Sequence, residues 1–413
     1  MIGIALAPGW AWCALPELGT TERPTIKAGP FGSALKKDSY VSTGYRVYGQ
    51  EQVIADDFTI GDYYIDVEKY RRLESCAVSP GDILVSLVGT YGKLSIVPDG
   101  IEPGIINPRL VRITLDRERV DPGYFAHFFR SPLAQFQLKA HAHGGTMDIL
   151  NATNLKQLAV PLPALDEQRR IAAILDKADA IRRKRQEAIK LTEDFLRSAF
   201  LDMFGDPVTN PQGWASEPLG GLIESITAGW SASAEGRQAR DGELGVLKVS
   251  AVTSGRFKPG SHKALPASLA ASRQLVTPVK GDLLFSRANT RELVAATCLV
   301  EDDYPNLFLP DKLWRIRPKK SMLGTEYLRY LFGDPRFRWQ VRRQATGTSG
   351  SMLNISQAKL RGVEAPVPPV ERQRKFAELV WRSYAIRSGL ESAADSSSEL
   401  FNALVQRAFR GEL

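Results

Sequence analysis

Few side chains in this 413-residue sequence stand at spacings that support catalysis. The segment Gly89-Thr-Tyr-Gly-Lys-Leu94 lacks the G-x-x-x-x-G-K-[ST] spacing of a phosphate-binding loop, so we interpret it as a tight turn. His141 and His143 form a His-x-His pair, a type that is more often solvated or in contact with phosphate than bound to a metal. Ser86 and Ser286 lack the Gly-x-Ser-x-Gly turn of a nucleophilic serine. The sequence therefore predicts no catalytic residue and no metal site.

Side chains suited to binding a nucleic acid are more numerous. The chain has 54 Lys and Arg against 46 Asp and Glu, a net charge of +8, and a pI near 9.3. This modest basic excess is compatible with a polyanionic partner. Base edges are read mainly by Arg, Lys, Asn and Gln, whereas phosphate contacts mostly position a protein. The candidates are Lys27, Lys36, Lys37, Lys93, Lys139, His141, His143, Arg237, Arg240, Arg256, Lys258, Arg287, Asn289, Arg291, Arg336, Arg338, Arg342 and Arg343.

The densest basic and aromatic stretch is Arg336-Phe-Arg-Trp-Gln-Val-Arg-Arg343. If this stretch is helical, its arginines and Trp339 fall on two adjacent faces that could contact DNA. The alternative is an amphipathic helix that packs Phe337 and Val341 inward and leaves its arginines in solvent. The sequence leaves both interpretations open.

The second half of the sequence repeats the first, and this repeat determines how the candidate residues are positioned. Each half ends in a Pro-x-Pro step followed by Gln-Arg, in Pro161–Ile171 and again in Pro366–Phe376, an offset of 376 − 171 = 205. The matched positions are mostly Gly, Pro and apolar residues, while the polar residues between them differ. Other matches join Gly9-Trp10 to Gly213-Trp214, Gly81–Ser86 to Gly281–Ser286, Leu110–Ile113 to Leu313–Ile316, and Tyr124…Pro132 to Tyr327…Pro335. We expect two copies of one scaffold with different surfaces.

The repeat predicts two mixed α/β heads, residues 1–163 and 207–368, each followed by a long helix, residues 164–206 and 369–413. Apolar residues recur in these helices at alternating three- and four-residue steps, the pattern of a coiled-coil seam. The seam residues are Ile171, Ile174, Ala178, Ile181, Phe195, Phe376, Leu379, Ile386, Leu400 and Leu404. We therefore predict an α+β fold in which the helices form one antiparallel rod and the halves are related by a pseudo-two-fold axis. About 38 helical residues span roughly 57 Å, on the order of one and a half turns of B-DNA.

The first long helix also carries a basic cluster, Arg182-Arg-Lys-Arg185, and Arg185 falls on the seam. Charge on a coiled coil is usually a solvated face or part of an inter-helix pair. The cluster could also follow a DNA backbone or meet an acidic patch on a protein partner, and the sequence does not decide among these.

Composition and cysteine usage indicate a soluble, cytoplasmic protein. A hydrophobic fraction of 43% is ordinary for a globular chain, and 413 residues are enough for more than one domain. Cys13, Cys76 and Cys298 are odd in number and unclustered, which favours a reducing compartment. The first residues lack the basic region of a signal peptide, and no stretch approaches the ~20 apolar residues of a membrane span.

The duplicated heads, the Pro-x-Pro and Gln-Arg helix entries and the C-terminal Ala408-Phe-Arg-Gly-Glu-Leu413 together resemble the specificity subunit of Type I restriction–modification systems. The resemblance covers essentially the full length. It implies that each head is a target-recognition domain for one half of a bipartite, asymmetric sequence in double-stranded DNA. It also implies that the helices set the gap between the halves and dock two methyltransferase subunits, which restriction and translocation subunits then join.

The same resemblance implies a chain without catalytic activity. The Asn/Asp-Pro-Pro-aromatic loop of adenine methyltransferases does not occur, so S-adenosylmethionine is expected on the methyltransferase partner and no cofactor on this chain. Two other interpretations are a coiled-coil adaptor and the remnant of a fused restriction–methyltransferase enzyme. The adaptor accounts for the seam, but it does not explain why two heads share a frame and differ in surface residues.

Overall fold

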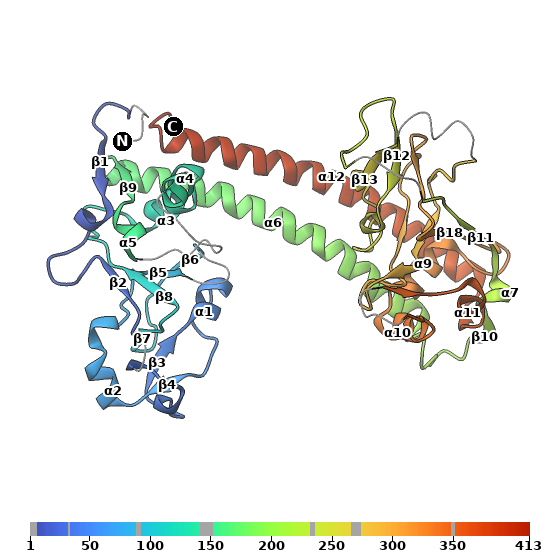
Figure 1. Ribbon diagram of the computed structural model, residues 1–413, viewed down its shortest axis with the longest axis horizontal. Coiled ribbons are helices and arrows are strands. Elements are labelled where there is room, and N and C mark those ends of the chain that lie inside the picture. The colour runs from blue at the N-terminus through green and yellow to red at the C-terminus, as the bar shows by residue number, and fades with distance from the viewer. Residues whose placement is uncertain are drawn as a thin grey trace. The chain divides into compact units, whose positions relative to one another are not determined.

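The computed structural model describes residues 6–31, 34–87, 92–140, 152–231, 236–265, 274–347 and 352–413. The candidates His141 and His143 lie outside these ranges. The chain divides into two compact units: unit 1 is Met1–Arg185 with Ala393–Leu413, and unit 2 is Gln186–Ser392. The two long helices, α6 (Leu165–Phe204) and α12 (Val370–Ala408), contribute to both (Figure 1). Each unit therefore combines one head with part of each long helix.

The described part of unit 1 contains three sheets. The largest has the order β2-β8-β5-β6 (Ile26–Ala28, Leu110–Ile113, Ile83–Ser86 and Leu94–Ile96), and its neighbours are antiparallel. The second has the order β4-β3-β7 (Tyr64–Ile65, Tyr45–Tyr48 and Gly104–Ile106), with β3 and β7 parallel. In the third, β1 (Ala11–Ala14) pairs with β9 (Ala159–Leu162). The shorter helices are α1 (Gln50–Ala55), α2 (Val67–Arg72), α3 (Pro122–Arg130), α4 (Pro132–Ala140) and α5 (Ala152–Lys156).

Unit 2 repeats these three sheets in the same order and with the same strand directions. They are β11-β18-β14-β16 (Ile223–Ala228, Leu313–Pro318, Leu283–Ser286, Thr297–Leu299), β13-β12-β17 (His262–Leu265, Leu244–Leu247, Leu307–Phe308) and β10-β20 (Ala215–Pro218, Glu364–Val367). As in unit 1, one pair, β12 with β17, is parallel. A short pair, β15 (Ala288–Asn289) with β19 (Leu353–Asn354), is added. The helices are α7 (Leu219–Leu222), α9 (Thr325–Gly333), α10 (Pro335–Arg343) and α11 (Gln357–Arg361).

The repeated Gly-Asp pair precedes a central strand of each four-stranded sheet. Gly81 and Gly281 have φ angles of +85° and +84°, a region that favours glycine because it carries no Cβ. Asp82 and Asp282 are buried, and each carboxylate accepts a hydrogen bond from a backbone N–H three residues earlier, at 2.8 and 3.0 Å. Both residues of the pair thus have a structural role in closing the turn.

A buried glutamine explains the Gln-Arg step at the start of each long helix. Gln168 is 0% exposed and accepts a hydrogen bond from the backbone N–H of Asp121 at 3.0 Å. Its side-chain amide donates to the carbonyls of Arg119 and Pro163, both at 2.9 Å. Gln373 makes the same three bonds at 2.6, 3.0 and 2.7 Å to the equivalent backbone groups of unit 2. Each glutamine therefore joins a head to its long helix.

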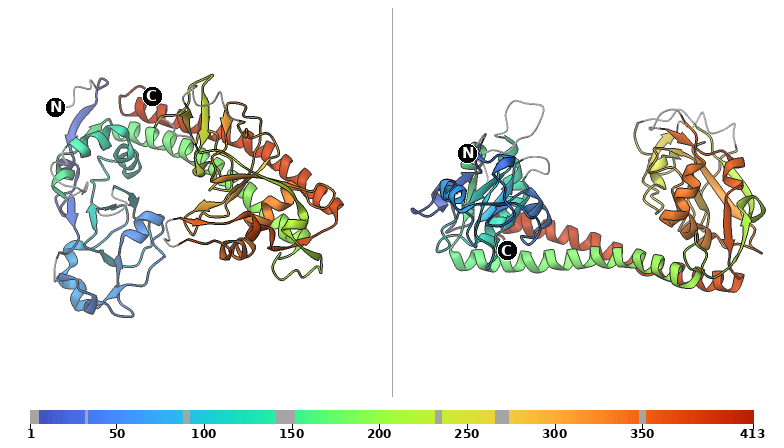
Figure 2. Two further views of the ribbon diagram at one scale, coloured as in Figure 1. Left: turned by 45° about the vertical axis from the view of Figure 1, so that its right-hand side comes forward. Right: turned by 90° about the horizontal axis from the view of Figure 1, so that it is seen from below.

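In unit 1, the first part of α6 packs antiparallel to the last part of α12 (Figure 2). The guanidinium of Arg182 lies 5.3 Å from the centre of the Phe401 ring. Arg185 donates hydrogen bonds to the carbonyl of Ala393 and the hydroxyl of Ser397. Two members of the basic cluster are therefore inter-helix contacts, in agreement with the structural interpretation of that cluster.

In unit 2, the last part of α6 and the first part of α12 are again antiparallel. The rings of Phe200 and Phe376 are 5.7 Å apart. Arg387 is 2% exposed, forms an ion pair with Glu301, and lies 4.0 Å from Glu193. The helix pair of this unit therefore contains a buried charged group next to an aromatic cluster.

The predicted seam is wrong at four positions. Ile181, Phe195, Ile386 and Leu400 are 50%, 52%, 62% and 59% exposed. Each inward-facing or half-buried position lies one residue later and is occupied by Arg182, Leu196, Arg387 and Phe401. Because arginine takes two of these positions, the apolar pattern alone pointed to the neighbouring residue. The remaining predicted seam residues, Ile171, Ile174, Ala178, Phe376, Leu379 and Leu404, are buried or half-buried. Among the described helices, including these two, none is long and apolar enough to cross a membrane.

Candidate nucleic-acid interface

The candidate lysines of the first head lie at separate places in unit 1. Lys27 is half-buried on β2, whereas Lys36, Lys37, Lys93 and Lys139 are exposed. Within the described ranges, none of them forms an ion pair with a carboxylate within 4.0 Å. An exposed ammonium group without such a partner keeps its charge available for a phosphate oxygen. These lysine side chains are therefore suited to contacting the phosphate backbone of a nucleic acid.

Six candidate cations of the second head fall into two groups of three. Three pair with carboxylates: Arg237 with Glu243, Arg256 with Glu391, and Arg336 with Asp206. Such pairs at the surface contribute little to stability and can exchange for a phosphate. Arg240, Lys258 and Arg291 are exposed and, in the part of the chain that the structure describes, have no ion pair within 4.0 Å. The second group is therefore the more accessible to an anion.

Two candidates directly follow the central strand β14. Arg287 is half-buried, and its guanidinium lies 5.8 Å from the centre of the Trp314 ring. Asn289 lies in β15, and its amide nitrogen is 3.4 Å from the hydroxyl of Ser286. These partners hold the side chains of Arg287 and Asn289 against the sheet. Both residues therefore contribute to packing of the head, in addition to any contact with DNA.

The basic and aromatic stretch is helical and lies in α10. Phe337 and Val341 are both 0% exposed, so the inward packing proposed for an amphipathic helix is confirmed. On the outer face, Trp339 is 56% exposed, and the guanidinium of Arg343 lies 4.9 Å from the centre of its ring. An exposed aromatic ring beside an arginine can stack on a base or contact a phosphate. The outer face therefore remains a candidate DNA contact.

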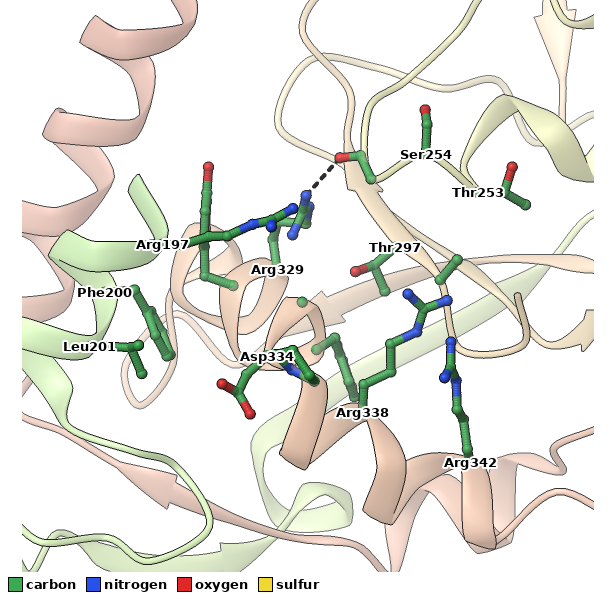
Figure 3. Close-up of a pocket in the computed structure, with 16 residues that line it drawn as sticks. Arg197, Phe200, Leu201, Thr253, Ser254, Thr297, Arg329, Asp334, Arg338 and Arg342 are labelled. Atoms are coloured by element: carbon green, nitrogen blue, oxygen red, sulfur yellow. Dashed lines mark hydrogen bonds between the residues drawn. The ribbon is translucent and has the colours of Figure 1, made fainter. Parts of the chain in front are cut away.

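Four arginines line a cavity of about 400 Å³ in unit 2 (Figure 3). Arg197 comes from α6, Arg329 from α9, and Arg338 and Arg342 from α10. Figure 3 shows the guanidinium groups of Arg197 and Arg329 close together and those of Arg338 and Arg342 close together near Thr297. The helix α6 and the consecutive helices α9 and α10, which are distant from α6 in the sequence, therefore bring four positive charges to one space.

Backbone carbonyls hold two of these guanidinium groups in place. Arg338 donates to the carbonyls of Glu292 and Val294 at 3.2 and 3.4 Å. Arg342 donates to the same two carbonyls, with its Nε 3.3 Å from the oxygen of Val294. Burial and the nearby positive charges of Arg342 and Arg329 lower the pKa of Arg338 to about 10. Since both side chains stay protonated near neutral pH, this cavity wall is positively charged.

Comparison with known proteins supports the resemblance found in the sequence. The model of the Type I restriction modification DNA specificity domain matches residues 32–191. The specificity subunit of the Type I restriction enzyme EcoKI from Escherichia coli K12 is 24% identical over 376 residues, which is 84% of this chain and 78% of that protein. The homologues that match most of this chain at moderate identity are specificity subunits of Type I restriction–modification systems. The resemblance stated from the repeat and the helix entries is therefore confirmed.

Two solved structures from Type I restriction–modification systems share the fold. The S subunit of the Type I system from M. genitalium has a TM-score of 0.56 at 15% identity, over 99% of this chain and 97% of that chain. A chain from a structure of complex assembly and conformational transition in the type I R-M system has a TM-score of 0.54 at 23% identity, over 99% and 100%. The mixed α/β class with long helices is thus confirmed. The curated relatives are specificity subunits and not catalytic subunits, which fits a non-catalytic role.

The sequence-based search of this specificity subunit missed Arg197 and Arg329. Both lie in helices whose patterns indicated packing, and Arg329 is only 4% exposed. A signal was present in the repeat, because the counterpart of Arg329 in the first half is Ala126, at an offset of 329 − 126 = 203. A buried position that is alanine in one copy and arginine in the other is not explained by the shared fold.

Proposed function

We propose that this specificity subunit reads a bipartite sequence in double-stranded DNA, with one half-site for each head, residues 1–163 and 207–368. The long helices, residues 164–206 and 369–413, form an antiparallel rod that sets the distance between the half-sites. The chain acts in the cytoplasm and binds no cofactor of its own. Methyl transfer from S-adenosylmethionine belongs to methyltransferase subunits, and cleavage belongs to restriction subunits.

One observation carries this proposal: the two heads share strand order and direction but differ in their exposed cations. The first head offers Lys36, Lys37, Lys93 and Lys139, and the second offers Arg240, Lys258, Arg291 and Arg343. Lysine acts on DNA mainly as a point charge, whereas arginine can bind the edge of guanine through two hydrogen bonds. Two identical scaffolds with different polar surfaces are suited to reading two different sequences.

A second observation supports docking of two methyltransferase subunits on the long helices. Each unit exposes an equivalent pair of large apolar side chains there, Ile181 with Leu400 in unit 1 and Phe195 with Ile386 in unit 2, and unit 2 also exposes Leu191 and Leu201. The repeat relates them, since 386 − 181 = 205 and 400 − 195 = 205. Exposed apolar groups mark protein contacts, and equivalent patches on two repeats fit two copies of one partner.

Introducing charge into one patch is expected to remove one methyltransferase subunit from the complex. The variants are Ile181→Glu with Leu400→Glu in unit 1, and Phe195→Glu with Ile386→Glu in unit 2. Because these side chains are exposed, each substitution should change the free energy of unfolding by only about 0.5 kcal/mol. The measurement is the mass of the purified complex by light scattering. Gln186→Glu, also exposed on α6, is the control, and an unchanged mass in both double variants would contradict this docking site.

The proposed function is tested by mapping methylated adenines across the genome, with the gene for this chain intact and deleted. We expect methylation to disappear from one two-part motif with a fixed spacer. The deletion strain complemented with the intact gene should regain it. Persistence of every methylated motif in the deletion strain, with the methyltransferase shown to be expressed, would contradict the proposal.

A further inference from the structure

The cavity of unit 2 holds more positive charge than its surroundings balance. It is lined by Arg197, Arg329, Arg338 and Arg342 (Figure 3). Among the described residues, Glu193 is the one carboxylate within 4.0 Å of any of these four groups, at 3.8 Å from Arg197 and 3.6 Å from Arg329. Arg338 and Arg342 have backbone carbonyls as partners and no such carboxylate.

Two other carboxylates, those of Asp334 and Glu292, lie near the cavity, but they do not neutralise the positive charge of its arginines. Asp334 lines it, but its carboxylate accepts hydrogen bonds from the backbone N–H groups of Arg336 and Phe337 at 3.0 and 2.9 Å. Burial lowers the pKa of Arg342, and the charge of the exposed Glu292 only partly offsets that effect. An anion placed between the guanidinium groups would relieve their mutual repulsion.

The chemistry of the cavity wall suits phosphate oxygens. Hydroxyl groups of Thr253, Ser254 and Thr297 accompany the four arginines. Guanidinium groups bind phosphate through short, charge-assisted and often paired hydrogen bonds, and hydroxyl groups donate to the remaining oxygens. The volume of about 400 Å³ lies within the range of small-ligand pockets, so it accepts more than a single phosphate group.

The other copy of the fold forms without arginine at these four positions. The repeat replaces Arg197, Arg329, Arg338 and Arg342 with Asn402, Ala126, Gln135 and Lys139. The strand register places Leu94 opposite Val85 where unit 2 has Thr297 opposite Phe285. A cavity of about 220 Å³ exists at the equivalent place in unit 1, lined by Ser131, Pro132, Leu133, Val405, Gln406, Phe409 and Arg410. Arg410 corresponds to Gly205, since 410 − 205 = 205, so it is not the counterpart of any of the four arginines. The shared scaffold therefore accounts for a hollow at this place, whereas the arginines are particular to unit 2.

We propose that the arginine-lined cavity of unit 2 is a binding site for a phosphate-bearing ligand with at least two negative charges. The ligand sits between the Arg338–Arg342 pair on one side and the Arg197–Arg329 pair on the other. Its source is either a free phosphorylated compound or the phosphate backbone of DNA, since both present the same oxygens. The site is independent of which DNA sequence the two heads read.

The test is a calorimetric titration of inorganic pyrophosphate into the full-length chain at constant ionic strength. We expect saturable binding that is weakened about tenfold or more by Arg338→Gln with Arg342→Gln, because two charged donors are lost. Arg338→Lys with Arg342→Lys should retain more affinity than the glutamine variant. Arg374→Gln with Arg382→Gln, which removes two exposed arginines of the same unit, should bind as the unmodified chain does.

A variant at an exposed position, Arg197→Gln, tests the site without the risk that the substitution prevents folding. Arg197 is 66% exposed, so Arg197→Gln should fold normally and still weaken pyrophosphate binding about threefold. The proposal is overturned if chloride at equal ionic strength reproduces the pyrophosphate signal. It is also overturned if Arg197→Gln and the folded Arg338→Gln, Arg342→Gln variant both bind with unchanged affinity.

Competition with labelled duplex DNA separates the two sources. If pyrophosphate and duplex compete, and the glutamine variant also loses affinity for DNA, the ligand is a backbone phosphate. If duplex binds equally well to the pyrophosphate-loaded chain, the ligand is a free phosphorylated compound. Both results support the site, and they are distinct from failure of the proposed function, which the methylation map reports.

Discussion

Replacing residues 207–368 with a second copy of residues 1–163 is expected to convert the methylated motif from two different halves into two inverted copies of one half. The expectation follows from the shared strand order of the heads and from the pseudo-two-fold relation that we propose between them. The junctions lie outside the helices, since α6 ends at Phe204 and α12 begins at Val370. The readout is the methylated motif in a strain that lacks the original gene.

The packing of the heads on the helices indicates that this chimera can fold. In unit 2, Tyr327 packs on Phe204 with ring centres 4.9 Å apart. In unit 1, Tyr124 packs on Phe409 at 5.4 Å, and both pairs are related by the repeat, since 327 − 124 = 203 and 409 − 204 = 205. The control is the original chain with only the junction residues altered. Retention of the original asymmetric motif by a folded chimera would exclude head-by-head recognition, and it is the result that a coiled-coil adaptor would give.

The features that sequence analysis predicted correctly are those fixed by local backbone chemistry. Gly81 and Gly281 adopt positive φ angles that favour glycine, so the match between Gly81–Ser86 and Gly281–Ser286 is recognisable in the sequence. The helix α10 was predictable because Phe337 and Val341 stand four residues apart and share its buried face. Such signals are contained in a few neighbouring residues, which a single sequence displays.

The features that sequence analysis missed depend on contacts between distant segments. The seam was displaced by one residue at Ile181 and Ile386 because Arg182 and Arg387 occupy the inward positions. The partners that make those positions acceptable, such as Glu301 for Arg387, lie far away in the sequence. The arginine-lined cavity was missed for the same reason, because its walls come from α6, α9 and α10. Hydropathy treats every arginine as exposed, so buried guanidinium groups are assigned to the wrong face.

Replacing the buried glutamine at either helix entry with leucine is expected to destabilise the chain strongly. The volume of the side chain is nearly kept, but one backbone N–H and two carbonyls lose their partner in Gln168→Leu or Gln373→Leu. An unsatisfied buried polar group costs about 1–3 kcal/mol, so we expect a loss of at least about 3 kcal/mol in the free energy of unfolding. Urea denaturation followed by circular dichroism measures this loss.

The neighbouring arginines provide matched controls for this prediction. Arg169→Ala and Arg374→Ala alter side chains that are 58% and 68% exposed, and each should shift the free energy of unfolding by no more than about 0.5 kcal/mol. Gln373→Glu separates shape from hydrogen bonding, because a carboxylate can still accept from the N–H of Gly324 but cannot donate to the two carbonyls. If the Gln373→Leu variant were as stable as the Arg374→Ala variant, the hydrogen bonds of Gln373 would not be what holds the head on the long helix. If the loss is as large as expected, the repeated Gln-Arg step is conserved between the two halves because it fixes each head to the helix that carries it.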